Sequence, residues 1–135
     1  MLRRCLTAAV LLALTPMAAM ADPVGIYDVV GTNPDNGGEY KGTAEVKRTG
    51  DTYSVTWSIG GSDFVGTGLG AKFVSETRFE TGLATPDDIA ISVGYVANNT
   101  FGVAMYFEQP DGQWEGVWTY GGSTKATTEK WFRKK

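Results

Sequence analysis

A strict alternation of apolar and polar side chains is the feature that most restricts the fold of this chain. From Thr52 to Ile59 every odd position is apolar and every even position carries a hydroxyl group. Successive side chains of a β-strand point to opposite faces, so this pattern predicts a strand with one buried face and one wet face. An amphipathic helix would instead place its apolar residues three and four positions apart.

Similar rows recur along the rest of the chain. Four more segments alternate in the same way, with rows at Tyr40, Gly42, Ala44 and Val46, at Ile89, Ile91, Val93 and Tyr95, at Phe101, Val103, Met105 and Phe107, and at Trp114, Gly116, Trp118 and Tyr120. We expect each of these rows to face the core. Turn clusters rich in glycine, asparagine, aspartate and proline separate the segments, most of them about 10 to 14 residues apart. This spacing is typical of an all-β sandwich or barrel.

Short connections between one-sided strands indicate antiparallel pairing, because a parallel crossover needs a dozen or more residues. We therefore predict an all-β fold, an antiparallel meander that closes into a roughly eight-stranded up-and-down barrel of the lipocalin or avidin type. The last strand, around residues 125–133, would pair with the first, around residues 25–31. Residues 71–80 remain open between a separate strand and a flap that continues into the 81–88 loop.

The first 21 residues have the pattern of a signal peptide. Arg3 and Arg4 form a basic head, residues 6–14 are almost entirely apolar, and Ala19-Met20-Ala21 offers a cleavage site. We expect residues 1–21 to be removed, leaving one β-barrel domain at residues 22–135 in the periplasm or outside the cell. We expect no membrane-spanning segment, because the apolar run is shorter than the roughly 20 residues that a spanning helix needs.

Charge and reactive residues narrow the classes of function. Only two of the 12 basic residues lie in the predicted signal peptide, and all 15 acidic residues follow it, so the mature net charge is −5. An acidic chain with scattered basic residues disfavours nucleic acid as a partner. Cys5, the only cysteine, lies in the signal peptide, and the chain has no histidine. The mature chain therefore lacks a thiol nucleophile, a thiolate metal ligand and histidine, the commonest general base and transition-metal ligand, and we expect no enzyme, metal site or cofactor.

One carboxylate departs from the outward-facing pattern. Six acidic residues of the strands, Glu108 among them, are expected to face outward, whereas Glu129 shares its strand face with Trp131. A buried carboxylate at this place predicts a structural partner for a lysine, an arginine or a tyrosine hydroxyl. A carboxylate-dependent hydrolase remains the least favoured function.

Aromatic residues are unusually frequent, at 16 of the 114 residues expected after cleavage. Eight of them are expected to line the barrel interior as candidate ligand-binding residues: Tyr27, Tyr40, Tyr53, Trp57, Phe64, Tyr95, Trp114 and Trp118. They would fill the core, form a cup for one small ligand, or share surface patches with a protein partner. An aromatic-x-glycine pattern recurs at residues 40–42, 64–66 and 114–116. Such glycines let a barrel curve under covering rings or leave interior volume for a guest.

Several stretches together resemble a known group of proteins. They include Gly25-x-Tyr27-x-Val29-x-Gly31, Gly50-Asp51-x-Tyr53-x-Val55-x-Trp57, Asp111-Gly112-x-Trp114-x-Gly116-x-Trp118 and Thr128-Glu129-Lys130-Trp131. The chain resembles small secreted bacterial β-proteins often described as fibronectin-binding, over nearly all of the mature chain except residues 71–88. The resemblance implies an exported barrel-like protein that binds a host or matrix protein, and it supplies no catalytic or binding residues.

The expected function is that of an exported, monomeric, non-enzymatic binding module. Its partner would be an extracellular or host-matrix protein such as fibronectin, or a small apolar ligand inside the barrel. An inhibitor or accessory protein of an envelope enzyme is the alternative. The candidate partner loop comprises Lys72, Phe73, Asp87 and Asp88.

Overall fold

The computed structural model describes residues 21–135, so the predicted signal peptide lies outside the described residues except for Ala21. The described part contains nine β-strands and no helix. The strands are β1 (Gly25–Thr32), β2 (Glu39–Thr49), β3 (Thr52–Ile59), β4 (Ser62–Ser75), β5 (Arg78–Gly82), β6 (Ala90–Ala97), β7 (Thr100–Glu108), β8 (Trp114–Tyr120) and β9 (Thr127–Arg133).

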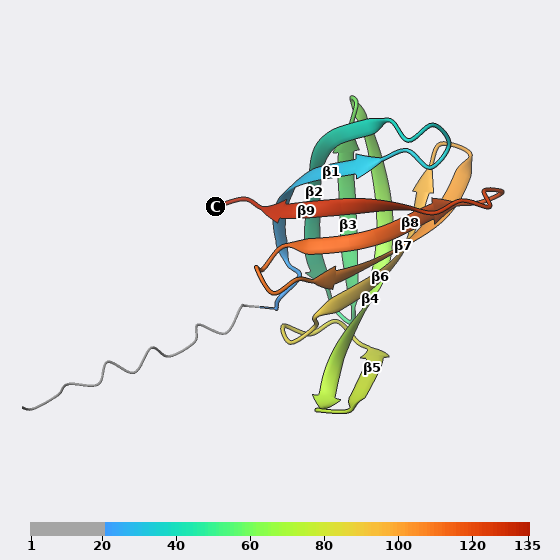
Figure 1. Ribbon diagram of the computed structural model, residues 1–135. Helices are drawn as coiled ribbons and strands as arrows, with labels where there is room; N and C mark the ends of the chain where they lie inside the picture. Colours follow the sequence, from blue (N-terminus) through green and yellow to red (C-terminus); the bar gives the residue numbers. More distant parts are fainter. Residues whose placement is uncertain (1–20) are drawn as a thin grey trace, which may run out of the picture.

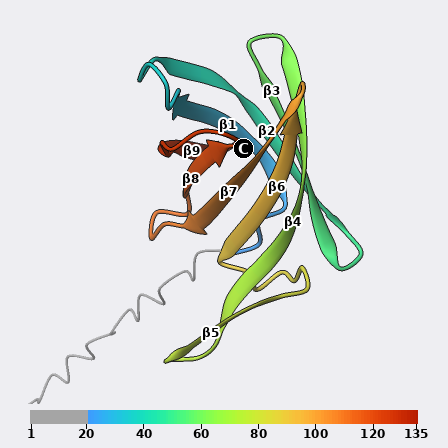
Figure 2. The same ribbon diagram turned by 90° about the vertical axis from the view of Figure 1, so that its right-hand side faces the viewer.

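Eight of these strands close into an up-and-down barrel, as the sequence predicts (Figures 1 and 2). All pairs are antiparallel, and the order around the barrel is β1, β2, β3, β4, β6, β7, β8, β9 and back to β1. The last strand pairs with the first, with Trp131 opposite Val29. Closure leaves no unpaired edge among these eight strands, which removes the usual hazard of an open sheet.

The segment left open by the sequence forms a hairpin. β5 pairs only with β4, at residues 70–75 near the end of that strand, so the described chain has nine strands while the barrel has eight. Figure 1 shows the far end of β4 and the short β5 extending below the barrel wall. Phe73 and Phe79 pair across the hairpin with their ring centroids 5.3 Å apart.

Inward rows of β2, β3 and β6 agree with the alternation in the sequence, but the row predicted for β7 is reversed. Phe101 and Val103 are 69% and 57% exposed, and Met105 and Phe107 also lie on the outer wall. The neighbouring strand explains this orientation. Residues directly opposite each other in an antiparallel pair share a face, and the inward residues of β6 pair with Gly102, Ala104 and Tyr106.

The reversal also changes the expected position of one acidic residue. Glu108 shares the inner face of β7 with Tyr106 and is half-buried, so the prediction that it faces outward is wrong. Its Oε1 atom is buried without a hydrogen-bond partner among the described residues. Burial raises the pKa of Glu108, while the nearby Arg133 lowers it by a smaller amount.

Tyrosine rings cover glycines on adjacent strands. Tyr40 lies opposite Gly31, and Tyr95 lies opposite Gly102. In both pairs a Cβ atom on the glycine would overlap the tyrosine ring. The sequence pattern placed each ring beside a glycine of its own strand, whereas the close contacts are made across strands. These glycines let the rings lie flat against bare backbone inside the barrel.

Candidate functional site

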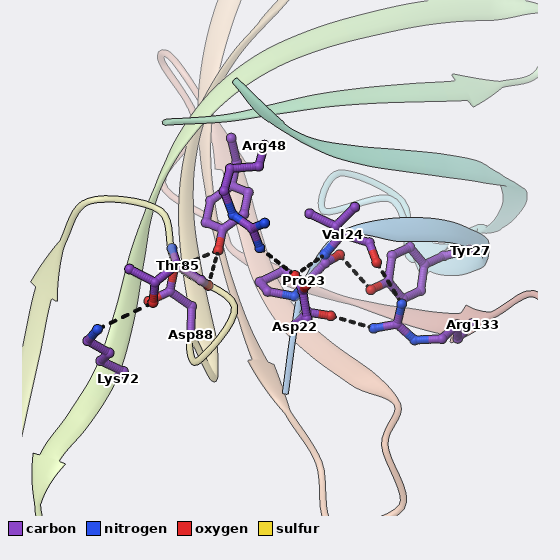
Figure 3. A network of polar contacts seen from close by, with 10 residues as sticks. Asp22, Pro23, Val24, Tyr27, Arg48, Lys72, Thr85, Asp88 and Arg133 are labelled. Carbon is purple, nitrogen blue, oxygen red and sulfur yellow. Dashed lines mark hydrogen bonds and ion pairs between the residues drawn. The ribbon is translucent and has the colours of Figure 1, made fainter. Parts of the chain in front are cut away.

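The two ends of the barrel differ, and one of them is closed by the segment that precedes β1 (Figure 3). The Tyr27 hydroxyl donates a hydrogen bond to the carbonyl of Pro23 at 2.6 Å. Arg133 donates to the carbonyls of Asp22 and Val24 at 2.6 and 2.7 Å. These bonds hold residues 22–24 against the ends of β1 and β9.

The loop between β5 and β6 closes the rest of that end. Asp88 is only 1% exposed and accepts hydrogen bonds from the Tyr53 hydroxyl at 2.6 Å and from the Thr85 backbone N–H at 2.7 Å. Thr85 lies beside it in Figure 3. A Cβ atom on Gly70 would overlap the Asp88 carboxylate, so only glycine fits there. The carboxylate thus anchors the loop from inside the protein.

The four residues of the candidate partner loop are therefore not equivalent. Asp88 is buried and cannot present its carboxylate to a partner. Lys72 is half-buried, with its ammonium 3.4 Å from the Thr85 hydroxyl. Phe73 and Asp87 are exposed and lie on the hairpin and the loop, respectively. Only these last two remain fully available on the surface.

The opposite end holds a cup of about 410 Å³. The turns at 33–38, 60–61, 98–99 and 121–126 connect the strands around this end. The lining is mostly aromatic and apolar, and its residues are Asn33, Tyr40, Trp57, Ile59, Phe64, Tyr95, Ala97, Thr100, Tyr106, Trp118, Tyr120 and Glu129. Its volume falls within the range of about 300–1,000 Å³ that is usual for small-molecule sites.

Five of the eight aromatic residues predicted from the sequence come together in this cup, namely Tyr40, Trp57, Phe64, Tyr95 and Trp118. The other three lie elsewhere. Tyr27 and Tyr53 serve the closed end through their hydroxyl groups, and Trp114 is fully buried in the core. The predicted set thus divides into a ligand-sized cup and ordinary core packing.

The most unusual residue of the cup is Glu129, which is 3% exposed and accepts four hydrogen bonds. Its Oε1 atom accepts from Trp131 Nε1 at 2.6 Å, from the Tyr106 hydroxyl at 2.8 Å and from Trp57 Nε1 at 3.0 Å. The Tyr40 hydroxyl donates to Oε2. The sequence predicts a buried Glu129 with a partner such as a tyrosine hydroxyl, and the structure places two tyrosines and two tryptophans there.

Strand pairing explains how the carboxylate fits inside the barrel. Glu129 lies between Gly31 of β1 and Gly116 of β8. Tyr40 covers the first glycine and Tyr106 covers the second, so that a Cβ atom at either position would overlap a ring. Two glycines beside the glutamate therefore make room for the two tyrosines that donate to it.

The site contains a carboxylate surrounded by neutral donors. Among residues 21–135 no lysine or arginine forms an ion pair with Glu129. Burial, and then the neighbouring Glu129, raise the pKa values of Tyr40 and Tyr106 well above the usual value for tyrosine. The same two causes raise the pKa of Tyr95 to about 12. These hydroxyls therefore stay protonated at neutral pH and act as donors.

Two residues of this centre are missing from the sequence-based set. Tyr106 is absent because the alternation in the sequence favours the exposed apolar row of β7 as the inner row. Trp131 enters only through the resemblance and through the strand face that it shares with Glu129. The glycines at 31 and 116 would have indicated large inward rings beside residue 129, once the strand register was known.

Trp118, which forms part of the cup wall, has an indole N–H group without an acceptor. Its Nε1 atom is buried and has no hydrogen-bond partner among the described residues. Nearer the rim, the Tyr120 hydroxyl donates to Asp35 at 2.6 Å and ties the end of β8 to the turn after β1. The cup therefore has a polar floor, aromatic walls and a rim at which a hydrogen bond joins β8 to the β1–β2 turn.

Residues 21–135 contain no group of three or more histidine, cysteine, aspartate or glutamate side chains placed to hold a metal ion. In the same part of the chain no helix has the length and apolar character needed to cross a membrane. Comparison of the chain with models of protein families and with curated proteins found no match.

Proposed function

We propose that this protein is an exported, non-enzymatic binding protein that holds one small, ring-bearing molecule in the open end of its barrel. The observation that carries the proposal is the cup of about 410 Å³ with aromatic walls, opposite an end that residues 22–24 and the 83–89 loop close. Liquid water occupies about 30 Å³ per molecule, so this volume equals about 14 water molecules. Such a cup suits a compact molecule better than a long lipid or a peptide.

Binding fits the chemistry of the cup better than hydrolysis does. A glycosidase of the usual kind needs two carboxyl groups flanking the bond that breaks. Glu129 is the only acidic residue that lines the cup, and four hydrogen bonds from the protein already engage it. The cup therefore lacks the second carboxyl group that such a reaction needs.

Filling the cup tests this function. Ala97 lines the cup, whereas the adjacent Val96 points outward and is 62% exposed. We expect Ala97→Phe to abolish binding of small aromatic molecules, measured by tryptophan fluorescence and calorimetry across a compound panel. Val96→Phe adds a ring on the outside of the same strand and should leave binding unchanged. A panel that binds equally to both variants would contradict the proposal.

A specific feature of the outer wall supports a second function, recognition of a protein partner. Phe101, Val103, Met105 and Phe107 form an exposed apolar row on β7. The row is widened by exposed residues of the two adjacent strands, Val96 of β6 and Val117 of β8, and by Val65 and Leu69 of β4, the next strand beyond β6. Apolar patches of this kind are uncommon on monomers that have no partner. A host-matrix protein, which the sequence resemblance implies, or an envelope enzyme would cover this face.

The hairpin extends this surface, because the rings of Phe79 and Phe107 stack with centroids 6.4 Å apart. We expect Val103→Glu to abolish capture of immobilised fibronectin, measured by surface plasmon resonance, while Ala97→Phe leaves it intact. Fibronectin binding that survives Val103→Glu, or no binding by the unaltered protein, would argue against this second function.

A further inference from the structure

We infer that the ligand of the cup is an organic cation, namely a protonated amine carried on a small ring. This inference rests on the proposed function and adds the chemical class of the ligand. The primary observation is a carboxylate at the floor without a cationic partner among the described residues: Glu129 lines the cup, and all four of its hydrogen-bond donors are neutral. A carboxylate only accepts hydrogen bonds, and a ligand ammonium only donates them.

The hydrogen bonds to the two carboxylate oxygens are unequal. Oε1 accepts from three side chains, Trp57, Tyr106 and Trp131, whereas Oε2 accepts from Tyr40 alone. A carboxylate offers about four lone-pair sites over its two oxygens. Oε2 therefore retains the capacity for one more donor. Both Glu129 and Tyr40, the single partner of Oε2, line the cup.

The walls suit the same kind of ligand. Four rings follow one another around the cup at steep angles: Tyr40 and Trp118 at 68°, Trp118 and Tyr95 at 68°, and Tyr95 and Trp57 at 61°. Their successive centroids are 6.2, 6.5 and 5.8 Å apart. Aromatic boxes of this kind recognise ammonium groups, because the ring faces carry negative electrostatic potential.

Charge in the rest of the cup does not compete with such a ligand. None of the 12 residues that line the cup is a lysine or an arginine. The cup therefore contains one acidic side chain and no basic side chain. Because Glu129 is only 3% exposed, water weakens its attraction for a cation less than it would weaken that of an exposed carboxylate. The same carboxylate disfavours an anionic ligand of the same shape.

Matched compounds separate the charge of the ligand from its shape. We would measure binding by calorimetry at neutral pH for phenyl, indolyl and naphthyl rings, each carrying an ethylamine, an ethanol or an acetate group. The inference predicts that the best amine binds at least tenfold more tightly than its alcohol and that its acetate does not bind. Alcohols that bind as tightly as the amines would overturn the cation while leaving the proposed function intact. No binding by any compound would overturn both.

Two kinds of variant test the role of the carboxylate. Glu129→Gln should abolish the preference for the amine over the alcohol. Because that variant perturbs a buried centre, a second pair is placed at Thr100, which lines the cup near the β6–β7 turn. Thr100→Lys should weaken amine binding at least fivefold relative to Thr100→Met, while both variants bind the alcohol alike. Equal amine affinity in these two variants would contradict the inference.

Discussion

Replacing Glu129 with leucine removes the acceptor that four buried or half-buried donors share. Leucine has a similar volume but no oxygen, so Trp57, Tyr106 and Trp131 would each keep a buried N–H or O–H group without a partner. Tyr40 is only partly buried, and its hydroxyl is at the cup, where water can replace the lost bond.

The expected loss of stability follows from these donors. Leaving a buried donor unsatisfied costs about 1–3 kcal/mol, so three donors cost about 3–9 kcal/mol. The free energy of unfolding of a domain of this kind is about 5–15 kcal/mol. We therefore expect Glu129→Leu to lose most of its stability or to fail to fold. Glu129→Gln keeps one acceptor oxygen and should lose less, about 1–3 kcal/mol, because neutral hydrogen bonds replace charge-assisted ones.

Urea unfolding followed by circular dichroism and tryptophan fluorescence measures both changes. Glu115→Leu is the matched control, since Glu115 lies on the adjacent β8, faces outward and forms an exposed ion pair with Lys130 at 3.1 Å. An exposed ion pair contributes at most about 1 kcal/mol. Some buried ionic groups can be replaced by apolar residues without loss. A Glu129→Leu protein as stable as the Glu115→Leu control would show that the same holds here and that the buried donors do not need the carboxylate.

Three further predictions concern stability. Gly70→Ala should lower the free energy of unfolding by about 1–3 kcal/mol, because the new methyl group displaces Asp88. The control is Gly94→Ala, since a Cβ atom on Gly94 meets nothing within 4 Å, and it should change the free energy of unfolding by less than about 0.5 kcal/mol in the same urea assay. Glu108→Gln should raise the melting temperature at pH 7 but not below about pH 4. Burial raises the pKa of Glu108, so ionisation of its carboxyl group lowers the stability only as the pH rises through this pKa. An equal gain in melting temperature at both pH values would contradict this role of burial. All six tyrosines have raised pKa values in the folded protein, so above about pH 10 the tyrosines of the unfolded chain ionise first and the free energy of unfolding should fall. If the phenolate absorbance at 295 nm rose well before unfolding, the folded tyrosines would not be protected from ionisation.

The alternation of side chains predicts most of the fold, because it depends only on the two-residue period of a strand. In β3 the odd-numbered residues Tyr53, Val55 and Trp57 are all buried, as expected. Short turns made the antiparallel barrel the natural closure. The structure of residues 71–80 could not be predicted in this way, because a hairpin that extends beyond the barrel has no buried face and therefore needs no alternation of apolar and polar residues.

The period identifies two faces of a strand without saying which of them lies inside. In β7 one face carries Phe101 and Val103, and the other carries Gly102, Ala104 and Tyr106. Hydrophobicity favours the first face, yet the second is buried. The deciding factor is the strand next to it, since Tyr95 of β6 needs the space above Gly102. Such a constraint joins residues on two strands and is invisible along one.

The all-β antiparallel barrel, the inward position of Glu129 and five aromatic residues of the cup could be predicted from the order of residues alone. The four neutral donors around Glu129, the place of Tyr106 among them and the burial of Asp88 at the closed end become visible only in the folded chain. The difference lies in the range of the interactions. Side-chain alternation is a local property of each strand, whereas the partners of a buried carboxylate are set by the register of strands that lie far apart in the chain.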